Sequence, residues 1–122
     1  MIRTIVVDDA KPMRDRAIMM CRNTGVMDIV GEASTAKETF ALIEQLQPDL
    51  LLMDVQLLEG NGVEIARKLK ADGSPVKVIL QTSMGQGGSS GVEFPKVIKP
   101  FHAEQLRVHL YQLFGERALR SA

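Results

Sequence analysis

The sequence predicts an α/β fold in which helices cover both faces of a parallel sheet. Short apolar runs rich in β-branched residues alternate with longer stretches whose apolar residues recur every three or four positions. Residues 50–53 form a continuous apolar run, which is typical of a strand buried on both faces. Because five predicted strands alternate with helices along 122 residues, a single doubly wound domain is expected.

The first half of the chain supplies three strands and two helices. The β-branched run at residues 2–7 indicates the first strand. Pro12 can begin the following helix, because the N–H that proline lacks has no partner in a first helical turn. Thr35, with Glu38 three residues later, is a capping-box signal for the second helix. This half is therefore expected to hold strands at 2–7, 28–33 and 50–53, and helices between Pro12 and Gly25 and between Thr35 and Pro48.

The second half continues the alternation with one interruption. Asn61 can cap a third helix. A strand is expected at 76–80, ending near Thr82, and another at 94–98, where Pro95 suits an edge strand. A fourth helix would lie at residues 84–91, but this segment holds four glycines, each costing about 1 kcal/mol in a helix relative to alanine. We expect this helix to be short or replaced by a glycine-rich loop.

Composition and charge exclude several classes of protein. Fifteen Lys and Arg balance fifteen Asp and Glu, so the net charge of zero argues against general nucleic-acid binding through a basic face. No apolar run approaches the roughly 20 residues that span a bilayer. Arg3 and Asp8 interrupt the short apolar start that a cleavable signal would need. The single cysteine, Cys21, excludes an internal disulfide and is compatible with a reducing compartment. We expect a cytoplasmic domain with no membrane insertion.

Polar residues follow four of the predicted strands. In open α/β sheets, ligands bind outside the carboxyl ends of the strands, where these residues would meet. Three aspartates crowded together repel one another, and this arrangement needs a cation or a raised pKa. Carboxylate oxygens are ligands that suit Mg²⁺, and a lysine and a hydroxyl beside them could hold a phosphoryl group. The candidate residues are Asp8 and Asp9 after the first strand, Asp54 after the third, Thr82 and Ser83 after the fourth, and Lys99 and Pro100 after the fifth.

Five short motifs stand at these strand ends or in the turns that follow. They are residues 5–9 (Ile-Val-Val-Asp-Asp), 48–54 (Pro-Asp-Leu-Leu-Leu-Met-Asp), 60–62 (Gly-Asn-Gly), 77–83 (Lys-Val-Ile-Leu-Gln-Thr-Ser) and 99–101 (Lys-Pro-Phe). Each is common by chance. Together and in this order, they resemble the receiver domain of response regulators in two-component signalling, over the chain up to about Leu113. The resemblance implies a flavodoxin-like sheet with strand order 2-1-3-4-5.

The resemblance also implies a phosphoacceptor and a Mg²⁺ site. Asp54 would accept the phosphoryl group, and Asp8, Asp9 and Asp54 would hold Mg²⁺ together with the backbone carbonyl of Gln56. The donor would be a phosphohistidine on a sensor histidine kinase or a histidine phosphotransfer protein. Phosphorylation would control binding to a downstream protein target, without direct nucleic-acid binding by this domain. Beyond catalysing its own phosphoryl transfer and dephosphorylation, the domain would be no enzyme.

Further residues receive roles from the same resemblance. Thr82 would bond a phosphoryl oxygen and shift toward it, and Lys99 would pair with the phosphoryl group. The peptide between Lys99 and Pro100 would be cis, which costs only about 0.5–1 kcal/mol before proline. Met84 lies two residues after Thr82, at a position that tunes the lifetime of the phosphoryl group in the family. Ser83 has a competing interpretation as a residue that merely ends the strand.

Two positions depart from the family pattern. Leu58 stands where proline is usual, which is expected to alter only the loop. Lys96 stands three residues before Lys99, where many receivers carry an aromatic switch residue. Lys96 and the glycine-rich segment 84–91 therefore leave open an alternative, a pseudo-receiver that binds partners but no longer switches.

The domain is expected over residues 1–115, followed by a C-terminal tail at 116–122. This length leaves no room for an output domain, yet a receiver cut from a longer transcriptional regulator is a second alternative. A phosphatase that forms an aspartyl phosphate is a third, which Gln56 disfavours because an amide cannot act as a general acid. Arg117 is expected on the solvated surface, and His102 is expected to cap the last helix.

Overall fold

Five parallel strands form the central sheet, in the order β2-β1-β3-β6-β7. The structure, a computed structural model, describes residues 1–83 and 93–119. The strands of this part are β1 (Ile2–Val7), β2 (Met27–Ala33), β3 (Leu50–Asp54), β4 (Gln56–Leu57), β5 (Gly60–Asn61), β6 (Lys77–Ser83) and β7 (Lys96–Lys99). Its helices are α1 (Lys11–Asn23), α2 (Ala36–Leu46), α3 (Gly62–Ala71), α4 (Ala103–Phe114) and a 3-10 helix (Gly115–Leu119). Counted in chain order, the strands of the central sheet confirm the predicted order 2-1-3-4-5.

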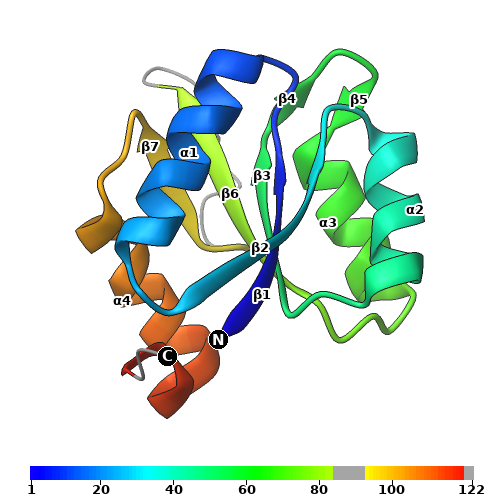
Figure 1. The fold of residues 1–122 in the computed structure, drawn as a ribbon. Helices are drawn as coiled ribbons and strands as arrows, with labels where there is room; N and C mark the ends of the chain where they lie inside the picture. The colour runs from blue at the N-terminus through cyan, green and yellow to red at the C-terminus, as the bar shows by residue number, and fades with distance from the viewer. Residues whose placement is uncertain (84–92, 120–122) are drawn as a thin grey trace.

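Helices cover both faces of the sheet, with α1 and α4 on one side and α2 and α3 on the other (Figure 1). The apolar side chains of β3 alternate between these two layers. In β3, Leu50 and Leu52 pack in the core beneath α1 and α4, whereas Leu51 and Met53 pack in the core beneath α2 and α3. All four are fully buried, which confirms a strand covered on both faces.

The predicted helix starts are confirmed, with one difference in a cap. Pro12 lies in the first turn of α1, and Asn61 Oδ1 accepts a hydrogen bond from the Val63 N–H at 2.8 Å. At α2, Thr35 Oγ1 accepts from the Glu38 N–H, as expected. The Glu38 carboxylate accepts from the Ser34 N–H at 3.0 Å, so the return bond goes one residue further out than in a regular capping box.

The strands differ from the prediction mainly in length. β6 ends at Ser83, one residue past Thr82, near which the strand was expected to end. β7 begins just after Pro95, whose carbonyl accepts from the Leu80 N–H. β7 lies at the edge of the sheet, as Pro95 suggested. The two-residue strands β4 and β5 were not predicted. They form an antiparallel hairpin that follows the carboxyl end of β3. The prediction for residues 84–91 and the candidate residue Met84 lie outside the described residues.

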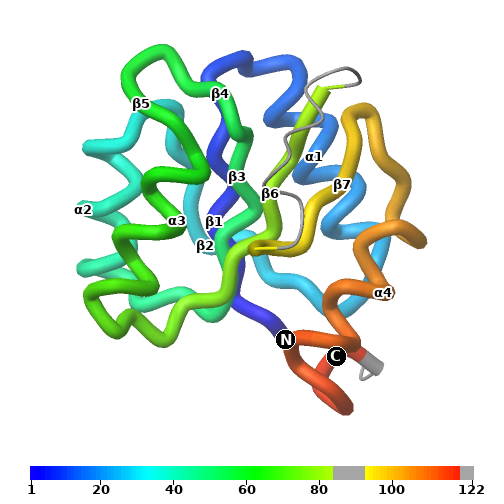
Figure 2. Tube along the Cα trace, turned by 180° about the vertical axis from the view of Figure 1, so that it is seen from behind, coloured from blue at the N-terminus to red at the C-terminus, as the bar shows by residue number. Residues whose placement is uncertain are grey.

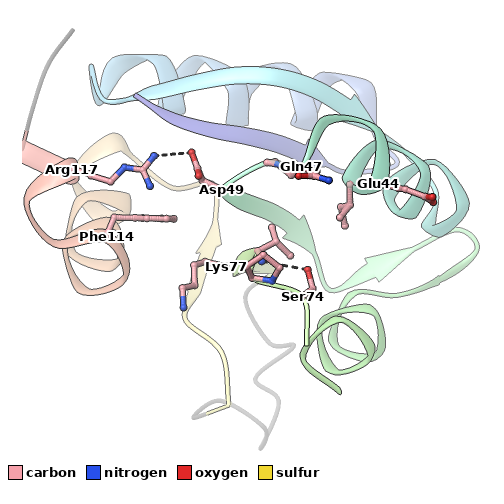
Figure 3. Close-up of a pocket in the computed structure, with 11 residues that line it drawn as sticks. Glu44, Gln47, Asp49, Ser74, Lys77, Phe114 and Arg117 are labelled. Carbon is pink, nitrogen blue, oxygen red and sulfur yellow. Dashed lines mark hydrogen bonds and ion pairs between the residues drawn. The ribbon is translucent and has the colours of Figure 1, made fainter. Parts of the chain in front are cut away.

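The carboxyl ends of β1, β3, β6 and β7 lie at the same end of the sheet, where the predicted site residues follow them (Figure 2). The opposite end holds a cavity of about 590 Å³ that Asp49, Phe114 and Arg117 help to line (Figure 3). Arg117 is half exposed, but it is not simply solvated as expected, because it donates to Asp49 Oδ2 at 2.8 Å. No helix within the described residues is long and apolar enough to span a membrane.

Candidate functional site

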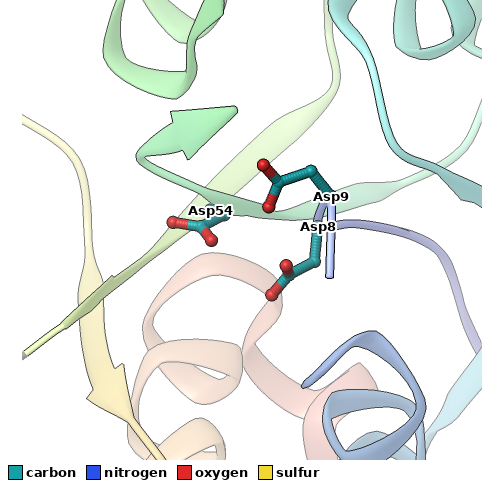
Figure 4. A group of neighbouring side chains, drawn as sticks. All are labelled: Asp8, Asp9 and Asp54. Atoms are coloured by element: carbon teal, nitrogen blue, oxygen red, sulfur yellow. The ribbon is translucent and has the colours of Figure 1, made fainter. Parts of the chain in front are cut away.

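Three aspartates gather where β1 and β3 end side by side. Val7 pairs with Met53 in the parallel ladder, so Asp8 and Asp9 follow β1 beside Asp54, the last residue of β3. One carboxylate oxygen from each aspartate lies within 4.8 Å of the others (Figure 4). Asp8 is fully buried and Asp54 is 5% exposed. The predicted acidic cluster is therefore present, and two of its three members are largely withdrawn from water.

Lys99 joins this cluster from the end of β7. Its Nζ lies 2.6 Å from Asp54 Oδ2 and 3.3 Å from Asp8 Oδ2. Burial alone would lower the pKa of Lys99, but its hydrogen bonds to the two carboxylates and their charges outweigh that effect and raise the pKa above 10.5. The ammonium is therefore charged at neutral pH. The peptide between Lys99 and Pro100 is cis, as the resemblance implied.

Main-chain groups hold the remaining carboxylate oxygens. The Ala10 N–H donates to Asp8 Oδ1 at 2.9 Å, and the Gln56 N–H donates to Asp54 Oδ1 at 3.1 Å. Each of these two aspartates therefore has one oxygen fixed by the backbone and the other by Lys99. The orientation of both carboxylates is set before any ligand arrives.

Arg14 also supports this end of the sheet. Its guanidinium donates from Nη1 to the main-chain oxygen of Asp8 at 2.8 Å and from Nε to Glu32 at 3.0 Å. It therefore ties α1 to the loop after β1. Arg14 was not predicted as a site residue, because an arginine on a predicted helix carries no sign of a bond to a main-chain oxygen outside that helix.

Gly62 allows the loop after Asp54 to fold tightly against α3. Its N–H donates to the Val55 oxygen at 2.7 Å. A Cβ built on Gly62 would collide with the main-chain oxygen of Asp54. The φ angle of Gly62 is not positive, so its backbone conformation alone does not call for glycine. The glycine is therefore required by a close approach of two backbone segments. In the sequence, Gly62 stands out only as part of the Gly-Asn-Gly turn motif.

A cleft of about 570 Å³ opens over this cluster. Asp9, Asp54, Lys99, Gln56 and Ser83 are among the residues that line it. The opposite cavity is slightly larger, but in the described chain the clustered carboxylates lie only at this cleft, so charge rather than size locates the site.

Thr82 and Ser83 lie at the carboxyl end of β6. Thr82 is 6% exposed and Ser83 is exposed, and they pair in the ladder with Ile98 and Lys99 respectively. The structure thus brings both hydroxyl residues to the end of the sheet that carries the acidic cluster. Their predicted roles toward a phosphoryl group stay predictions.

The charges and ligand atoms of the site fit a divalent cation. Three carboxylates and one ammonium give a formal charge of about −2. The clustered ligand atoms are all oxygens, which Mg²⁺ prefers over nitrogen or sulfur. Asp8, Asp9 and Asp54 could each offer one oxygen. Gln56 lines the same cleft, and the ligand role of its carbonyl stays a prediction.

Comparisons with known proteins agree with this geometry. Residues 4–111 match the model of the response regulator receiver domain. The sensory transduction protein LytT of Bacillus cereus is 30% identical over 87% of this chain and 44% of its own length. An uncharacterized response regulatory protein of Yersinia pestis is 30% identical over 93% of this chain and 48% of its own length. The chain thus spans about half the length of these curated relatives.

Solved structures show the same fold. A DNA-binding response regulator of the LuxR family from Staphylococcus aureus superposes with a TM-score of 0.81 at 19% identity, covering 93% of this chain and 98% of that one. The response regulator domain of Thermotoga maritima CheB gives a TM-score of 0.73 at 23% identity, covering 99% of this chain and 98% of that one. With the fold, the acidic cluster and the family match in agreement, the chain belongs to the receiver domains of response regulators.

Proposed function

We propose that this domain accepts a phosphoryl group on Asp54 from a phosphohistidine of a donor protein. A carboxylate oxygen of Asp54 attacks the phosphorus, a new P–O bond forms, and the P–N bond to the donor histidine breaks. The electron pair of that bond returns to the imidazole nitrogen, which regains a proton. The product is an aspartyl phosphate on this chain and a free histidine on the donor.

The observation that carries this proposal is the contact of Lys99 with Asp54. Its ammonium lies 2.6 Å from Asp54 Oδ2 at the floor of an open cleft. The Lys99 ammonium beside the acceptor can donate hydrogen bonds to the oxygens of an arriving phosphoryl group. Its positive charge offsets their negative charge in the transition state. Because the Gln56 N–H holds the other oxygen of Asp54, the acceptor needs little reorientation.

Mg²⁺ would be held by Asp8, Asp9 and Asp54 with the carbonyl of Gln56. When bound, such a cation neutralises charge on the phosphoryl oxygens and fixes their position. Removing Mg²⁺ with a chelator is therefore expected to stop phosphorylation. The three carboxylates at this end of the sheet support this part of the proposal.

The phosphorylated domain would act by binding a downstream protein, and its donor would be a sensor histidine kinase or a histidine phosphotransfer protein. The reaction takes place in the cytoplasm and turns over no substrate other than the donor and the bound phosphoryl group. A receiver that belongs to a longer regulator is a second candidate, because the matched relatives are about twice as long as this chain.

The test uses acetyl phosphate as the donor. We expect wild-type protein with Mg²⁺ to gain the mass of one phosphoryl group, with loss of the label in hydroxylamine. Asp54→Asn should gain none. Asp15→Asn is a matched control, because Asp15 is an exposed aspartate on α1 whose one ion pair within the described residues is with Lys11. Equal labelling of wild type and Asp54→Asn would refute the proposal.

A further inference from the structure

Gln81 is a buried polar residue that the proposed reaction does not use. It lies in β6, one residue before Thr82, and its Cα partners in the neighbouring strands are Asp54 and Val97. The side chain is fully buried. Within the described chain, neither the nitrogen nor the oxygen of its amide has a hydrogen-bond partner. Buried amide groups in native proteins are nearly always paired, so this side chain requires a partner.

The backbone of Gln81 is already engaged at the site. Its carbonyl accepts from the Val55 N–H at 2.9 Å, directly after the phosphoacceptor. The amide therefore extends from a strand position that is fixed to the loop after Asp54. A hydrogen-bond partner of the Gln81 amide would therefore link this strand position to the element on which that partner lies.

A small cavity borders the Gln81 side chain. Its volume is about 10 Å³, which is the room that one water molecule occupies. Its lining includes Arg16 and Met20 of α1, Lys99 at the end of β7 and Phe101 of the turn that follows. The cavity is thus bordered both by the unpaired amide of Gln81 and by the turn that begins at Lys99.

The chemistry of the lining favours water over other ligands. Gln81 offers both a donor and an acceptor, and Arg16 offers further donors. Arg16 also donates to the Phe101 carbonyl at 3.3 Å, which places a second acceptor at this turn. Nearby cationic side chains disfavour a metal ion, and the volume is too small for an organic molecule.

We propose that this cavity binds one water molecule, held by the Gln81 amide, and that the water joins β6 to the turn at residues 99–101. Resting on the proposed function, a second step follows. Gln81 is a positioning residue for Lys99, because the turn that the water holds begins at Lys99. A shift of this turn would displace Lys99 Nζ from Asp54, to which it is bonded at 2.6 Å.

The water site is tested by NMR on the full chain labelled with ¹⁵N. We expect a nuclear Overhauser effect between water and the side-chain amide protons of Gln81, with the sign of a long-lived complex. The amide protons should also exchange slowly. A resolved Gln81 side chain that shows no contact with a long-lived water would overturn the water site.

The positioning role is tested with variants and acetyl phosphate at saturating Mg²⁺. Gln81→Leu keeps the volume but removes the amide, and we expect about a threefold to tenfold lower maximal labelling rate, the loss of one hydrogen-bonded link. The Mg²⁺ concentration for half-maximal rate should not change. Gln81→Asn keeps an amide and leaves room for water, so it should recover most of the rate.

Ile79→Val is the matched control. Ile79 is a fully buried residue of the same strand, and it packs in the core layer that contains the buried residues of α1. It should lower the urea midpoint without changing the labelling rate. A wild-type rate in Gln81→Leu, or an equal loss in Ile79→Val, would refute the positioning role. If wild type takes no label at all, the proposed function fails, while the NMR measurement still decides the water site.

Discussion

Replacing Gly62 by alanine tests whether a backbone contact shapes the phosphoacceptor loop. The nearest atom to a Cβ at this position is the main-chain oxygen of Asp54, well inside the 3.0 Å that real Cβ atoms essentially never cross. The conflict therefore cannot be relieved by rotating a side chain. The loop after β3 and the start of α3 must move apart by several tenths of an ångström.

The magnitude follows from two opposing effects. Alanine is favoured over glycine in a helix by up to about 1 kcal/mol. Overpacking that forces a backbone shift costs about 1–3 kcal/mol. We expect Gly62→Ala to lose about 1–2 kcal/mol of unfolding free energy, which lowers Tm by roughly 4–8 °C in a domain of this size. Labelling of Asp54 by acetyl phosphate should also slow, because the shift moves the residue that carries the acceptor.

Urea unfolding followed by far-UV circular dichroism measures this effect, and Gly31→Ala is its matched control. The three atoms nearest to a Cβ at Gly31 belong to side chains rather than to the backbone, the closest being Leu46 Cδ1 at 3.3 Å. Gly31→Ala should therefore stay close to wild type in both stability and labelling rate. A Gly62→Ala protein that is as stable as wild type would refute the steric argument.

Three further predictions concern charge and burial. Lys99→Met should slow labelling of Asp54 by about 10²-fold, as loss of one charge-stabilising donor does, while calorimetry should show tighter Mg²⁺ binding because a positive charge has left the site. Burial raises the pKa of Cys21 to about 12, so its thiol should not react with Ellman's reagent at pH 8 until the chain is unfolded in urea. Although burial opposes it, the bond from Arg117 lowers the pKa of Asp49 below 3.8. Asp49→Asn should therefore be less stable than wild type above that pH, and the difference should vanish as acid protonates Asp49, as stability curves measured by urea titration would show.

Much of the fold could be predicted because its strands and helix starts follow from patterns of neighbouring residues in the sequence. The apolar run at 50–53 is typical of a short strand buried on both faces, and Asn61 and Thr35 mark helix starts through their own side chains. The residues of the acidic site could be predicted from their places at strand ends, whereas the strand order that makes β1 and β3 neighbours followed from the family resemblance. Asp8 and Asp54 each follow a strand directly, and parallel neighbours bring their carboxyl ends together.

The interactions that the sequence could not predict join segments far apart in the chain. Arg14 reaches Glu32 across 18 positions, and Arg117 reaches Asp49 across 68 positions. Gly62 is required by a contact with another backbone segment rather than by its own dihedral angles. Nothing in the local sequence distinguishes Gln81 from other strand residues, because its unpaired buried amide depends on which elements surround it. Such features depend on distances between elements, which no local pattern encodes.

The charge at the site gives a physical reason for a cation in the proposed reaction. The three aspartates and Lys99 together carry about −2, although the whole chain is neutral. Phosphorylation replaces the single charge of Asp54 with about two on the phosphoryl group, so the site becomes more negative as the product forms. Lys99 is already shared between Asp54 and Asp8 and cannot offset this increase by itself. A divalent cation between the same carboxylates would offset it, because its two charges exceed the one that the reaction adds.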